Sequence, residues 1–557
     1  MLFALLSRPI ATAAGTICLS AAFWGFGPSA QAQAENFGTA NPEIKVGIVQ
    51  RFGQDPDAQL VLEPLSGDRL TLQFNTGGQP QTVTTDRVQI AVESVPLDAP
   101  ELQEWVVLST HRSFESAEDS ANRWQLQGIE TEIAQPDAWQ VWAKREVYST
   151  PLLRRLLLDS LQAAGYSTTY IDSRVVTALP KASFTANGYR YSRDQLRITS
   201  ANRRIQVNQD GSRSLFAGDL TLQPNAYSTY TLVNQVPVEL YLRGVVPHEI
   251  GASAPTAAVQ AQAVLARTYA LRNLRRFEID DYQICADTQC QVYFGLGGAH
   301  PATDRAIAAT QGLVLTYGDE LVDALYSSTT GGVTASFSDV WNGPDRPYLQ
   351  PVIDSVQTNW DLAQKPLSEE ANFRAFIGLS EGFNEDDWPA FRWDRQASLE
   401  DITRVMKTYL GNRQHPLANL TQVTGLAVTE RSRSGRVQKL QVNTDVGSFE
   451  LLKDEAVKAL VPPRSLLFYL EPVYETAASP AEPSASAQPA PQLQGYRFIG
   501  GGFGHGVGMS QTGSYRLAEY GWSGSQILQF YYPGTELRPI SDEITFWQPS
   551  GPRAEQP

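Results

Sequence analysis

Residues 233–295 read VNQVPVELYLRGVVPHEIGASAPTAAVQAQAVLARTYALRNLRRFEIDDYQICADTQCQVYFG, and this stretch decides the fold. Its apolar first part, which ends at Pro247, predicts a strand that leads into a helical turn. Ser253 and Pro255 then have the order of an N-cap and an early helical proline, so we expect a long helix that ends near Phe277. Small residues repeat along one face of that helix, which predicts close packing inside a β-rich core.

Three polar residues in this stretch are candidates for chemistry. Glu249 is expected in the loop before the long helix, where a carboxyl shielded from water would have the raised pKa that a general acid needs. Gln262 and Arg267 stand among the small residues of the helix and are candidate substrate-binding residues. Most carboxylates in a protein are solvated, so the residues alone leave open that Glu249 is an ordinary surface acid.

The composition excludes several classes of protein. A length of 557 residues is too great for one core and predicts roughly three or four domains. Hydrophobic residues make up 42% of the chain, which excludes wholesale disorder. The net charge of −15 argues against a nucleic-acid partner, because nucleic-acid binding needs a strongly basic face. Three cysteines are too few for a disulfide scaffold.

Residues 1–34 have the features of a secretory signal peptide. Arg8 precedes an apolar run, and Ala-x-Ala cleavage patterns follow at Ala30–Ala32 and Ala32–Ala34. The alternative is an uncleaved membrane anchor, for which the apolar run is short. Cleavage would remove Cys18 and predicts a location in the periplasm or cell envelope. No later segment is apolar enough to cross a membrane, so no transmembrane segment is expected after signal cleavage.

Two small domains are expected before the core. Residues 40–100 alternate between apolar and polar positions and contain Gly/Asp turns, which predicts a small β domain. Residues 101–178 have the order strand, helix, strand, strand, helix, strand. This order resembles the SPOR module, whose family binds peptidoglycan glycan strands that lack stem peptides. A plain ferredoxin-like α+β domain without a ligand has the same order and stays an open alternative.

The remainder is expected to form an interrupted β-rich core. Residues 183–475 are dense in predicted strands, apart from a mainly helical insertion at 366–418. Residues 476–493 are rich in Pro, Ala and Ser and predict a linker. Residues 494–545 return to the core, and 546–557 predict a disordered tail. The expected fold class is therefore α+β and multidomain, with a long helix crossing the core.

Glycine occupies every even position from Gly500 to Gly508. In an extended chain this pattern leaves one face as bare backbone, which a sugar ring could approach closely. Phe503, His505 and the nearby Gln511 are then candidate substrate-binding residues. The alternative is a close-packed strand crossing, which uses glycine for the same steric reason.

The segment YSSTTGG, residues 326–332, follows a predicted strand and should form a polar loop. Tyr326, Ser327 and Ser328 offer hydroxyl groups that could hydrogen-bond to a substrate, so they are further candidate substrate-binding residues. The alternative is an ordinary β-turn of small polar residues.

Five motifs in order resemble the stage II sporulation protein D family, also called the amidase-enhancer or LytB-like family. They are YLRGVVPHEI, AVQAQAVLARTYAL, CADTQCQVYFG, ATQGLVLTYGDELVDALYSSTTGG and GGGFGHGVGMSQTGSYRLAEYGWSGSQILQFYYPGTEL. Several long motifs in the right order are a specific signal. The resemblance covers residues 183–540, with the helices at 366–418 and the linker as departures, and it implies a SpoIID-like catalytic core. It also places the YSSTTGG loop beside the active-site groove.

The resemblance implies a lytic transglycosylase that cleaves MurNAc-GlcNAc bonds of glycan strands stripped of peptide. The family's catalytic acid corresponds to Glu249, which would act as general acid and then as general base. A hydrolase needs two carboxylates, but here the C6 hydroxyl of the muramic acid closes onto C1 and leaves a 1,6-anhydro end, so one carboxyl suffices. The lactyl carboxylates of such strands favour a neutral or basic groove, with Arg267 as the nearest candidate.

Two alternatives stay open. Some family members are described as enhancers of a partner enzyme, so the chain could be a non-catalytic, peptidoglycan-binding enhancer of an N-acetylmuramoyl-L-alanine amidase. A structural envelope protein with a degenerate site is a third reading. Retention of Glu249 within an intact motif favours the enzyme, because a pure binder has no need of a positioned acid.

Cys285 and Cys290 are separated by four residues in a chain expected to be secreted, which favours a disulfide if their Cα atoms lie within about 6.8 Å. Some members of the resembled family instead bind zinc here through two cysteines and histidines, one of them directly before the second cysteine. In this chain that position is Gln289. His300 or Asp287 would have to complete a tetrahedral site. We therefore expect no cofactor, with zinc at Cys285 and Cys290 as the alternative.

Overall fold

A computed structural model describes residues 41–413, 415–475 and 492–547. The predicted signal peptide at 1–34, nearly all of the linker at 476–493 and the tail from 548 onward lie outside the described residues. Everything described falls within one compact unit that begins at Gly38.

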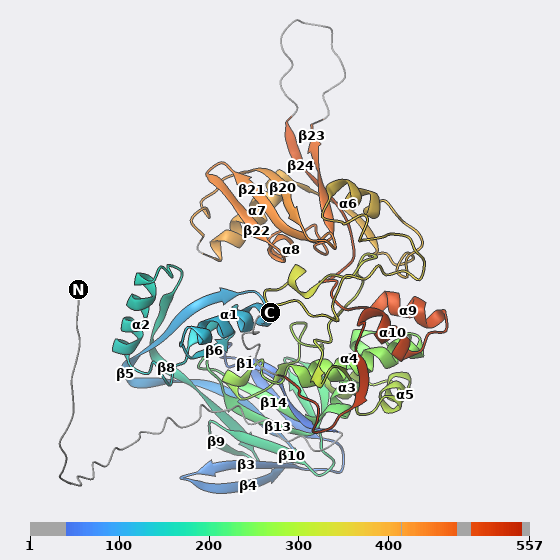
Figure 1. Ribbon diagram of the computed structural model, residues 1–557. Helices are drawn as coiled ribbons and strands as arrows, with labels where there is room; N and C mark the ends of the chain where they lie inside the picture. The colour runs from blue at the N-terminus through green and yellow to red at the C-terminus, as the bar shows by residue number, and fades with distance from the viewer. Residues whose placement is uncertain (1–40, 414, 476–491, 548–557) are drawn as a thin grey trace, which may run out of the picture. The chain divides into compact units, whose positions relative to one another are not determined.

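A seven-stranded sheet forms the base of the core (Figure 1). Its strands come from residues 43–85 and from 196–285. The two sets share one hydrophobic core, in which the fully buried residues Ile44, Val46, Leu70 and Leu72 pack with residues of the later strands. In spatial order its strands are β15 (Ile284–Cys285), β1 (Glu43–Phe52), β14 (Tyr230–Pro237), β13 (Asp219–Pro224), β10 (Leu196–Ser200), β3 (Leu70–Thr76) and β4 (Gln79–Thr85).

This pairing differs from the expected separate β domain at 40–100. The strand β1 pairs with β14 along its whole length, and β3 pairs with β10. Alternating apolar positions predict a strand but not its partner, since any strand with a matching buried face satisfies them. Residues 43–85 therefore build the same two sheets as residues 196–237.

A second sheet continues into the predicted α+β module. Its main path runs β12 (Ser212–Ala217), β11 (Arg204–Gln209), β2 (Gln59–Pro64), β5 (Val88–His111), β7 (Trp139–Ala143) and β6 (Thr131–Ala134), and β8 (Tyr170–Ala186) pairs with both β5 and β9 (Tyr189–Ser192). Two helices, α1 (Phe114–Leu126) and α2 (Pro151–Ala163), complete the expected order of the module. The strand order β8-β5-β7-β6, antiparallel throughout, is that of a ferredoxin-like split βαβ fold.

The buried helix α4 (Thr256–Arg272) is the centre of the core. It contacts four other helices, namely α3 (Val238–Glu249), α5 (Pro301–Ala309), α9 (Gln511–Glu519) and α10 (Gly524–Tyr531) (Figure 1). Every residue from Ala261 to Arg272 is buried, so the expectation of a small-residue helix inside the core is confirmed. The bounds were wrong: Pro255 rather than Ser253 is the N-cap residue, and the helix ends five residues before Phe277, because Asn273 caps it.

The second half of the chain adds small sheets. A three-stranded sheet contains β17 (Glu320–Leu321), β16 (Leu313–Tyr317) and β26 (Glu536–Pro539), and β18 (Tyr326–Ser327) pairs with β25 (Met509–Ser510). Two further sheets contain β19 (Arg392–Ser398), β24 (Leu493–Gly501) and β23 (Phe468–Tyr474), and β20 (Val423–Arg431), β21 (Val437–Thr444) and β22 (Gly447–Leu452). Besides α9 and α10, this region contains the helices α6 (Glu370–Ile377), α7 (Leu399–Gly411) and α8 (Glu455–Lys458).

The predicted helical insertion at 366–418 contains α6 and α7 but also the strand β19. That strand pairs with β24, so the segment is part of a core sheet rather than an appendage. Within residues 41–413, 415–475 and 492–547, no helix combines the length and apolar character needed to cross a bilayer.

Candidate functional site

Glu249 is the last residue of α3 rather than part of a loop. Pro247 lies in the last turn of the helix, where only His248 and Glu249 follow it, and Gly251 then adopts a left-handed φ of 81° that ends the helix. Gly244 lets the chain around Tyr293 and Gly295 approach α3 closely, since a Cβ there would collide with the carbonyl of Gly295. This close approach brings the 291–295 segment to Glu249.

Two hydrogen-bond donors hold the Glu249 carboxyl group. The backbone N–H of Val292 donates to Oε1 at 2.8 Å, and the hydroxyl of Tyr326 also donates to the carboxylate. Burial raises the pKa of Glu249 above its ordinary value, and these two hydrogen bonds partly oppose the rise. The carboxyl group therefore keeps its proton to a higher pH than a solvated glutamate does, as a general acid requires.

A chain of buried side chains orients Tyr326. The hydroxyl of Tyr241 donates to Gln291 Oε1 at 3.2 Å, and Gln291 Nε2 donates to the Tyr326 hydroxyl at 3.1 Å. Burial and the neighbouring Glu249 charge raise the pKa of Tyr326 well above its ordinary value, so its proton stays available to Glu249. The chain Tyr241, Gln291, Tyr326, Glu249 thus runs in one donor direction, which strengthens each bond.

Gln511, the first residue of α9, holds the backbone of the acid. Its Nε2 donates to the carbonyl of Glu249 at 2.9 Å and to Gln262 Oε1 at 3.4 Å. Gln262 is fully buried in α4, and its own Nε2 has no hydrogen-bond partner among the described residues. The structure therefore places Gln262 behind Gln511 rather than at the surface of the site.

Glu249 lies in a cavity of about 690 Å³. Seven of the residues singled out from the sequence line it, namely Glu249, Tyr326, Ser327, Ser328, Phe503, His505 and Gln511. Phe503 is about half exposed, so its ring can be reached by a ligand. The chain thus brings together residues separated by more than 250 positions at one cavity, although their roles in binding or catalysis stay predictions.

Arg267 is not among these residues. It is fully buried in α4, where its Nε and Nη2 bind both carboxylate oxygens of Glu239 at 2.7 and 2.8 Å and Nη1 donates to the carbonyl of Leu313. The prediction that Arg267 contacts the substrate is therefore wrong. Sequence position could not reveal this, because a helix of small residues that is buried all round has no exposed face.

The glycine run also differs from the expectation of an extended strand. The strand β24 ends at Gly501, and Gly502, Gly504, Gly506 and Gly508 have φ values between 74° and 100°. A Cβ at Gly506 or Gly508 would collide with the Arg436 guanidinium or the Leu325 carbonyl. These glycines therefore allow a tightly packed loop with left-handed backbone angles, which agrees with the close-packing alternative. Phe503 and His505 of this loop nevertheless line the cavity.

His505 is held by the backbone around it. The N–H of Val507 donates to Nδ1 at 3.0 Å, so the neutral ring carries its proton on Nε2. Burial lowers the pKa of His505 to about 4, and the ring packs 5.1 Å from that of Trp341. His505 is therefore neutral near pH 7.

The charges of the cavity nearly balance. Its lining contains the cations Arg112, Arg276, Lys458 and Arg464 and the acids Glu115, Glu249 and Asp454. Arg112 binds Asp454 at 3.0 Å, and Arg276 binds Glu115 at 2.9 Å. Within the described part of the chain Arg464 forms no ion pair, and its guanidinium lies 6.0 Å from the ring of Phe503. Arg464, rather than Arg267, is thus the cation available to an anionic ligand.

Cys285 and Cys290 form a disulfide, with their Cα atoms 5.6 Å apart. Gln291 and Val292 follow directly, so the bridge fixes the base of the segment that holds Glu249 and Tyr326. The disulfide predicted from the sequence is therefore present in the structure.

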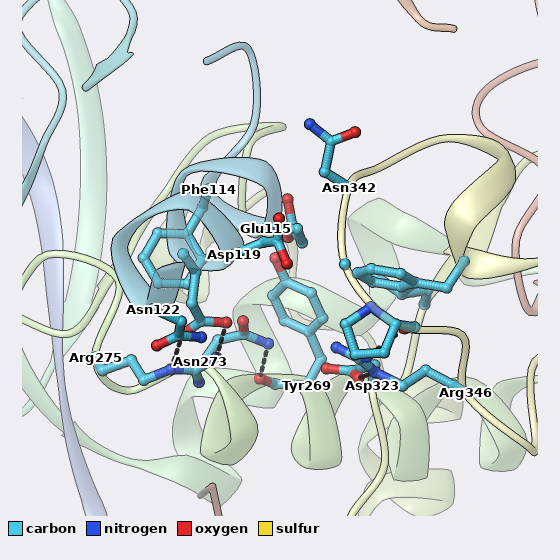
Figure 2. Close-up of a pocket in the computed structure, with 15 residues that line it drawn as sticks. Phe114, Glu115, Asp119, Asn122, Tyr269, Asn273, Arg275, Asp323, Asn342 and Arg346 are labelled. Carbon is cyan, nitrogen blue, oxygen red and sulfur yellow. Dashed lines mark hydrogen bonds and ion pairs between the residues drawn. The ribbon is translucent and has the colours of Figure 1, made fainter. Parts of the chain in front are cut away.

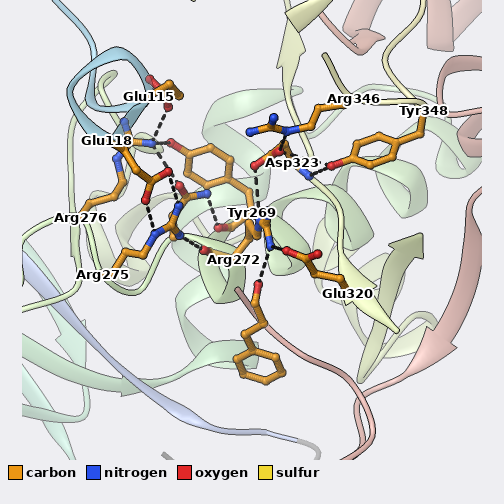
Figure 3. A network of polar contacts seen from close by, with 12 residues as sticks. Glu115, Glu118, Tyr269, Arg272, Arg275, Arg276, Glu320, Asp323, Arg346 and Tyr348 are labelled. Atoms are coloured by element: carbon orange, nitrogen blue, oxygen red, sulfur yellow. Dashed lines mark hydrogen bonds and ion pairs between the residues drawn. The ribbon is translucent and has the colours of Figure 1, made fainter. Parts of the chain in front are cut away.

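The α+β module docks onto α4 through ion pairs (Figure 3). Arg275 binds Glu118 at 2.5 Å and Arg276 binds Glu115, which joins the segment that follows α4 to α1. The docked module contributes Arg112 and Glu115 to a wall of the Glu249 cavity.

Asp323 belongs to the same network of charges (Figure 3). Burial alone would raise the pKa of Asp323, but Arg272 and Arg346 hold it below its ordinary value.

A second, much smaller cavity lies between α1 and the 342–346 loop, lined among others by Glu115, Asp119, Asn122, Arg275 and Arg346 (Figure 2). Its volume of about 30 Å³ is close to that of a single water molecule, so it cannot hold a sugar.

Sequence reasoning missed the residues that support Glu249. Gln291 and Val292 stand in the motif CADTQCQVYFG and Tyr241 stands in YLRGVVPHEI, but none of the three is a site candidate on sequence grounds. Their membership of those motifs was the available signal.

Comparison with known proteins shows which family this chain is similar to. Residues 226–317 match the model of the stage II sporulation protein family, SpoIID. The chain is 28% identical over 410 residues to the amidase enhancer of Bacillus subtilis, and the match covers 67% of this chain and 53% of that protein. These matches support the resemblance to the SpoIID family that the sequence motifs indicate.

Other relatives agree with this similarity. The stage II sporulation protein D of Bacillus subtilis is 26% identical over 341 residues, which cover 58% of this chain and 81% of that protein. The protein of the same name from Bacillus amyloliquefaciens is 25% identical over 320 residues, 55% of this chain and 75% of that protein. The chain spans about half the length of the amidase enhancer that it matches. Residues 335–508 match a domain of unknown function, DUF8618.

Proposed function

We propose that this chain is a cell-wall protein of the SpoIID family and acts as a lytic transglycosylase on peptide-stripped peptidoglycan glycan strands. The observation that carries the proposal is the environment of Glu249: a carboxyl group with a raised pKa, fixed by Val292 and Tyr326, in a cavity that also offers an exposed aromatic ring.

The reaction needs one group that first gives and then takes a proton. Protonated Glu249 donates its proton to the glycosidic oxygen as the bond from C1 of the muramic acid breaks. The resulting carboxylate takes the proton of the C6 hydroxyl, whose oxygen bonds to C1 and closes the 1,6-anhydro ring. Glu249 is then protonated again, so no water molecule is consumed.

The other acids of the cavity are poorly placed to act as a second catalytic carboxylate. Glu115 is bound by Arg276, and Asp454 is bound by Arg112 and Lys458. A hydrolytic mechanism needs a carboxylate free to activate water or attack the sugar. Within the described cavity lining, the ion pairs therefore favour the single-carboxyl reaction.

A second candidate is a non-catalytic enhancer of a cell-wall amidase, and the similarity to a protein named amidase enhancer supports it. On either reading we propose an envelope or periplasmic location, with glycan strands as the ligand. An enhancer that does not cut has no use for the raised pKa of Glu249, which is why we favour the enzyme.

The variant Glu249→Gln tests the proposal. It keeps the shape of the side chain but cannot donate a carboxyl proton, so release of soluble glycan from denuded sacculi should fall by about 10³-fold or more, while co-sedimentation with the sacculi persists. Glu519→Gln, an exposed glutamate on α9, is the matched control and should keep wild-type release. Equal release by Glu249→Gln and wild type would reject Glu249 as the acid, and binding without release by the wild type would favour the enhancer.

A further inference from the structure

The backbone of the Tyr326–Gly332 loop is held by a buried carboxylate. Glu385 is fully buried, and its two oxygens accept hydrogen bonds from three consecutive N–H groups: Thr330 at 2.6 Å, Gly331 at 2.8 Å and Gly332 at 2.9 Å. The Thr330 hydroxyl donates to the same carboxylate at 3.0 Å. Successive N–H groups that converge in this way form an anion nest, here filled by a side chain of the protein.

Two arginines, the fully buried Arg436 and the partly buried Arg392, hold the carbonyl groups of the same loop and of Val333, which follows it. Arg436 donates through Nη2 to the carbonyls of Thr330 at 2.9 Å and Val333 at 2.8 Å. Arg392 donates through Nη1 to the carbonyl of Gly331 at 2.9 Å. Burial lowers the pKa of Arg436 to about 10 and that of Arg392 to about 9, so both remain charged at neutral pH.

The same carboxylate also reaches the start of α9. The hydroxyl of Ser510, the N-cap of that helix, donates to Glu385 Oε1. Gln511 follows directly and holds the carbonyl of Glu249, and Ser327 pairs with Ser510 across the β18–β25 bridge. Glu385 is thus linked to Glu249 by two routes, one through the loop to Tyr326 and one through Ser510 to Gln511.

The cost of burying these charges indicates that they serve more than packing. A buried charge without a partner is strongly destabilising, and apolar side chains usually fill such space with equal or better stability. Asp354 lies beside Glu385, and its carboxyl is hydrogen-bonded to that of Glu385 and to Tyr531. An apolar core would lack this fixed set of donors and acceptors around the four consecutive residues from Thr330 to Val333.

We propose that Glu385, Arg392 and Arg436 are positioning residues that hold Tyr326 and Gln511 in the places where these two residues fix Glu249. All three belong to the 335–508 segment that matches a domain of unknown function. The inference gives that segment a role in the active site, and its catalytic meaning rests on the proposed function.

Glu385→Gln tests the inference, because the amide keeps the size of the side chain but removes the charge that three N–H groups share. The turnover number should fall by about 10- to 100-fold, as expected for a small displacement of catalytic groups, with a smaller change in KM. Loss of the Tyr326 hydrogen bond removes a contact that stabilises the Glu249 carboxylate, so the alkaline limb of the pH–rate profile should move to higher pH.

Arg431→Met is the matched control. Arg431 is also a buried arginine of this segment, but it binds Glu370 and the carbonyls of Gly435 and Phe468 rather than the loop. It should lower the melting temperature and leave the alkaline limb in place. If Glu385→Gln does not fold, Arg436→Lys replaces it, since lysine keeps the charge but cannot span both carbonyls.

A second readout does not depend on turnover. The pKa of Glu249, followed by carboxyl 13C NMR and assigned by the signal missing in Glu249→Gln, should rise in Glu385→Gln and stay at the wild-type value in Arg431→Met. An unchanged Glu249 pKa and an unmoved alkaline limb in a folded Glu385→Gln protein would overturn the inference. A wild-type protein that makes no anhydro product would instead reject the proposed function, and the NMR comparison would still decide the positioning role.

Discussion

The side-chain amide of Gln511 donates a hydrogen bond to the backbone carbonyl of Glu249 at 2.9 Å, across 262 positions of sequence. This contact joins the first residue of α9 to the last residue of α3. On its other side, the carboxyl group of Glu249 is held by Val292 and Tyr326. Three segments far apart in the chain thus fix one acid.

Tyr326→Phe should change the pKa of Glu249 and leave the shape of the site unchanged. The variant removes the hydroxyl that donates to the carboxylate, so the pKa of Glu249 should rise and the alkaline limb of activity should move to higher pH. Loss of one hydrogen bond to a charged group should slow turnover by about 10-fold. The pH–rate profile checks the prediction, and a limb that moves to lower pH would contradict the hydrogen bond.

Much of this site could be predicted from the sequence, and the misses have physical reasons. Glu249, Tyr326 and Gln511 stand in recognisable motifs, and all three reach the same cavity. Arg267 stands in a motif as well, but whether a polar residue on a buried helix faces a cavity or an ion pair depends on tertiary packing. Strand pairing between residues 43–85 and 196–237 was equally hidden, because alternation determines a buried face and not its partner.

The sequence pattern does not predict the cluster of Glu385, Arg392 and Arg436. Each residue is an ordinary charged residue in a segment expected to be a helical insertion or a strand, and charged residues are rarely buried. Only the three-dimensional placement of the Tyr326–Gly332 loop reveals their common target.

The stability of the protein should depend on pH through Glu249. Its pKa in the folded state lies above the ordinary value of 4.5, so the folded state binds more protons than the unfolded state between that value and the raised pKa. Wild-type stability should therefore fall relative to Glu249→Gln as the pH rises through this window, and the difference should level off above it. Chemical denaturation of both proteins across the pH range measures this difference, and a difference that grows in favour of the wild type would refute the raised pKa.

Arg267→Met should destabilise the protein rather than weaken substrate binding. The change leaves Glu239 largely buried without its bidentate partner, at a cost of about 3–5 kcal/mol. Arg243→Met is the matched control, because the Arg243–Asp304 pair is partly exposed and should contribute less than about 1 kcal/mol. Urea denaturation checks both values, and a weaker affinity of a stably folded Arg267→Met protein for glycan strands would restore the original prediction.

The chemical nature of the product tests the central claim most directly. Purified protein is incubated with denuded glycan strands in water labelled with 18O, and the released ends are analysed by mass spectrometry. A lytic transglycosylase with Glu249 as its only catalytic carboxyl predicts 1,6-anhydro-muramic ends that are one water lighter than reducing ends and carry no 18O. Reducing ends that contain 18O would show hydrolysis and would contradict the claim.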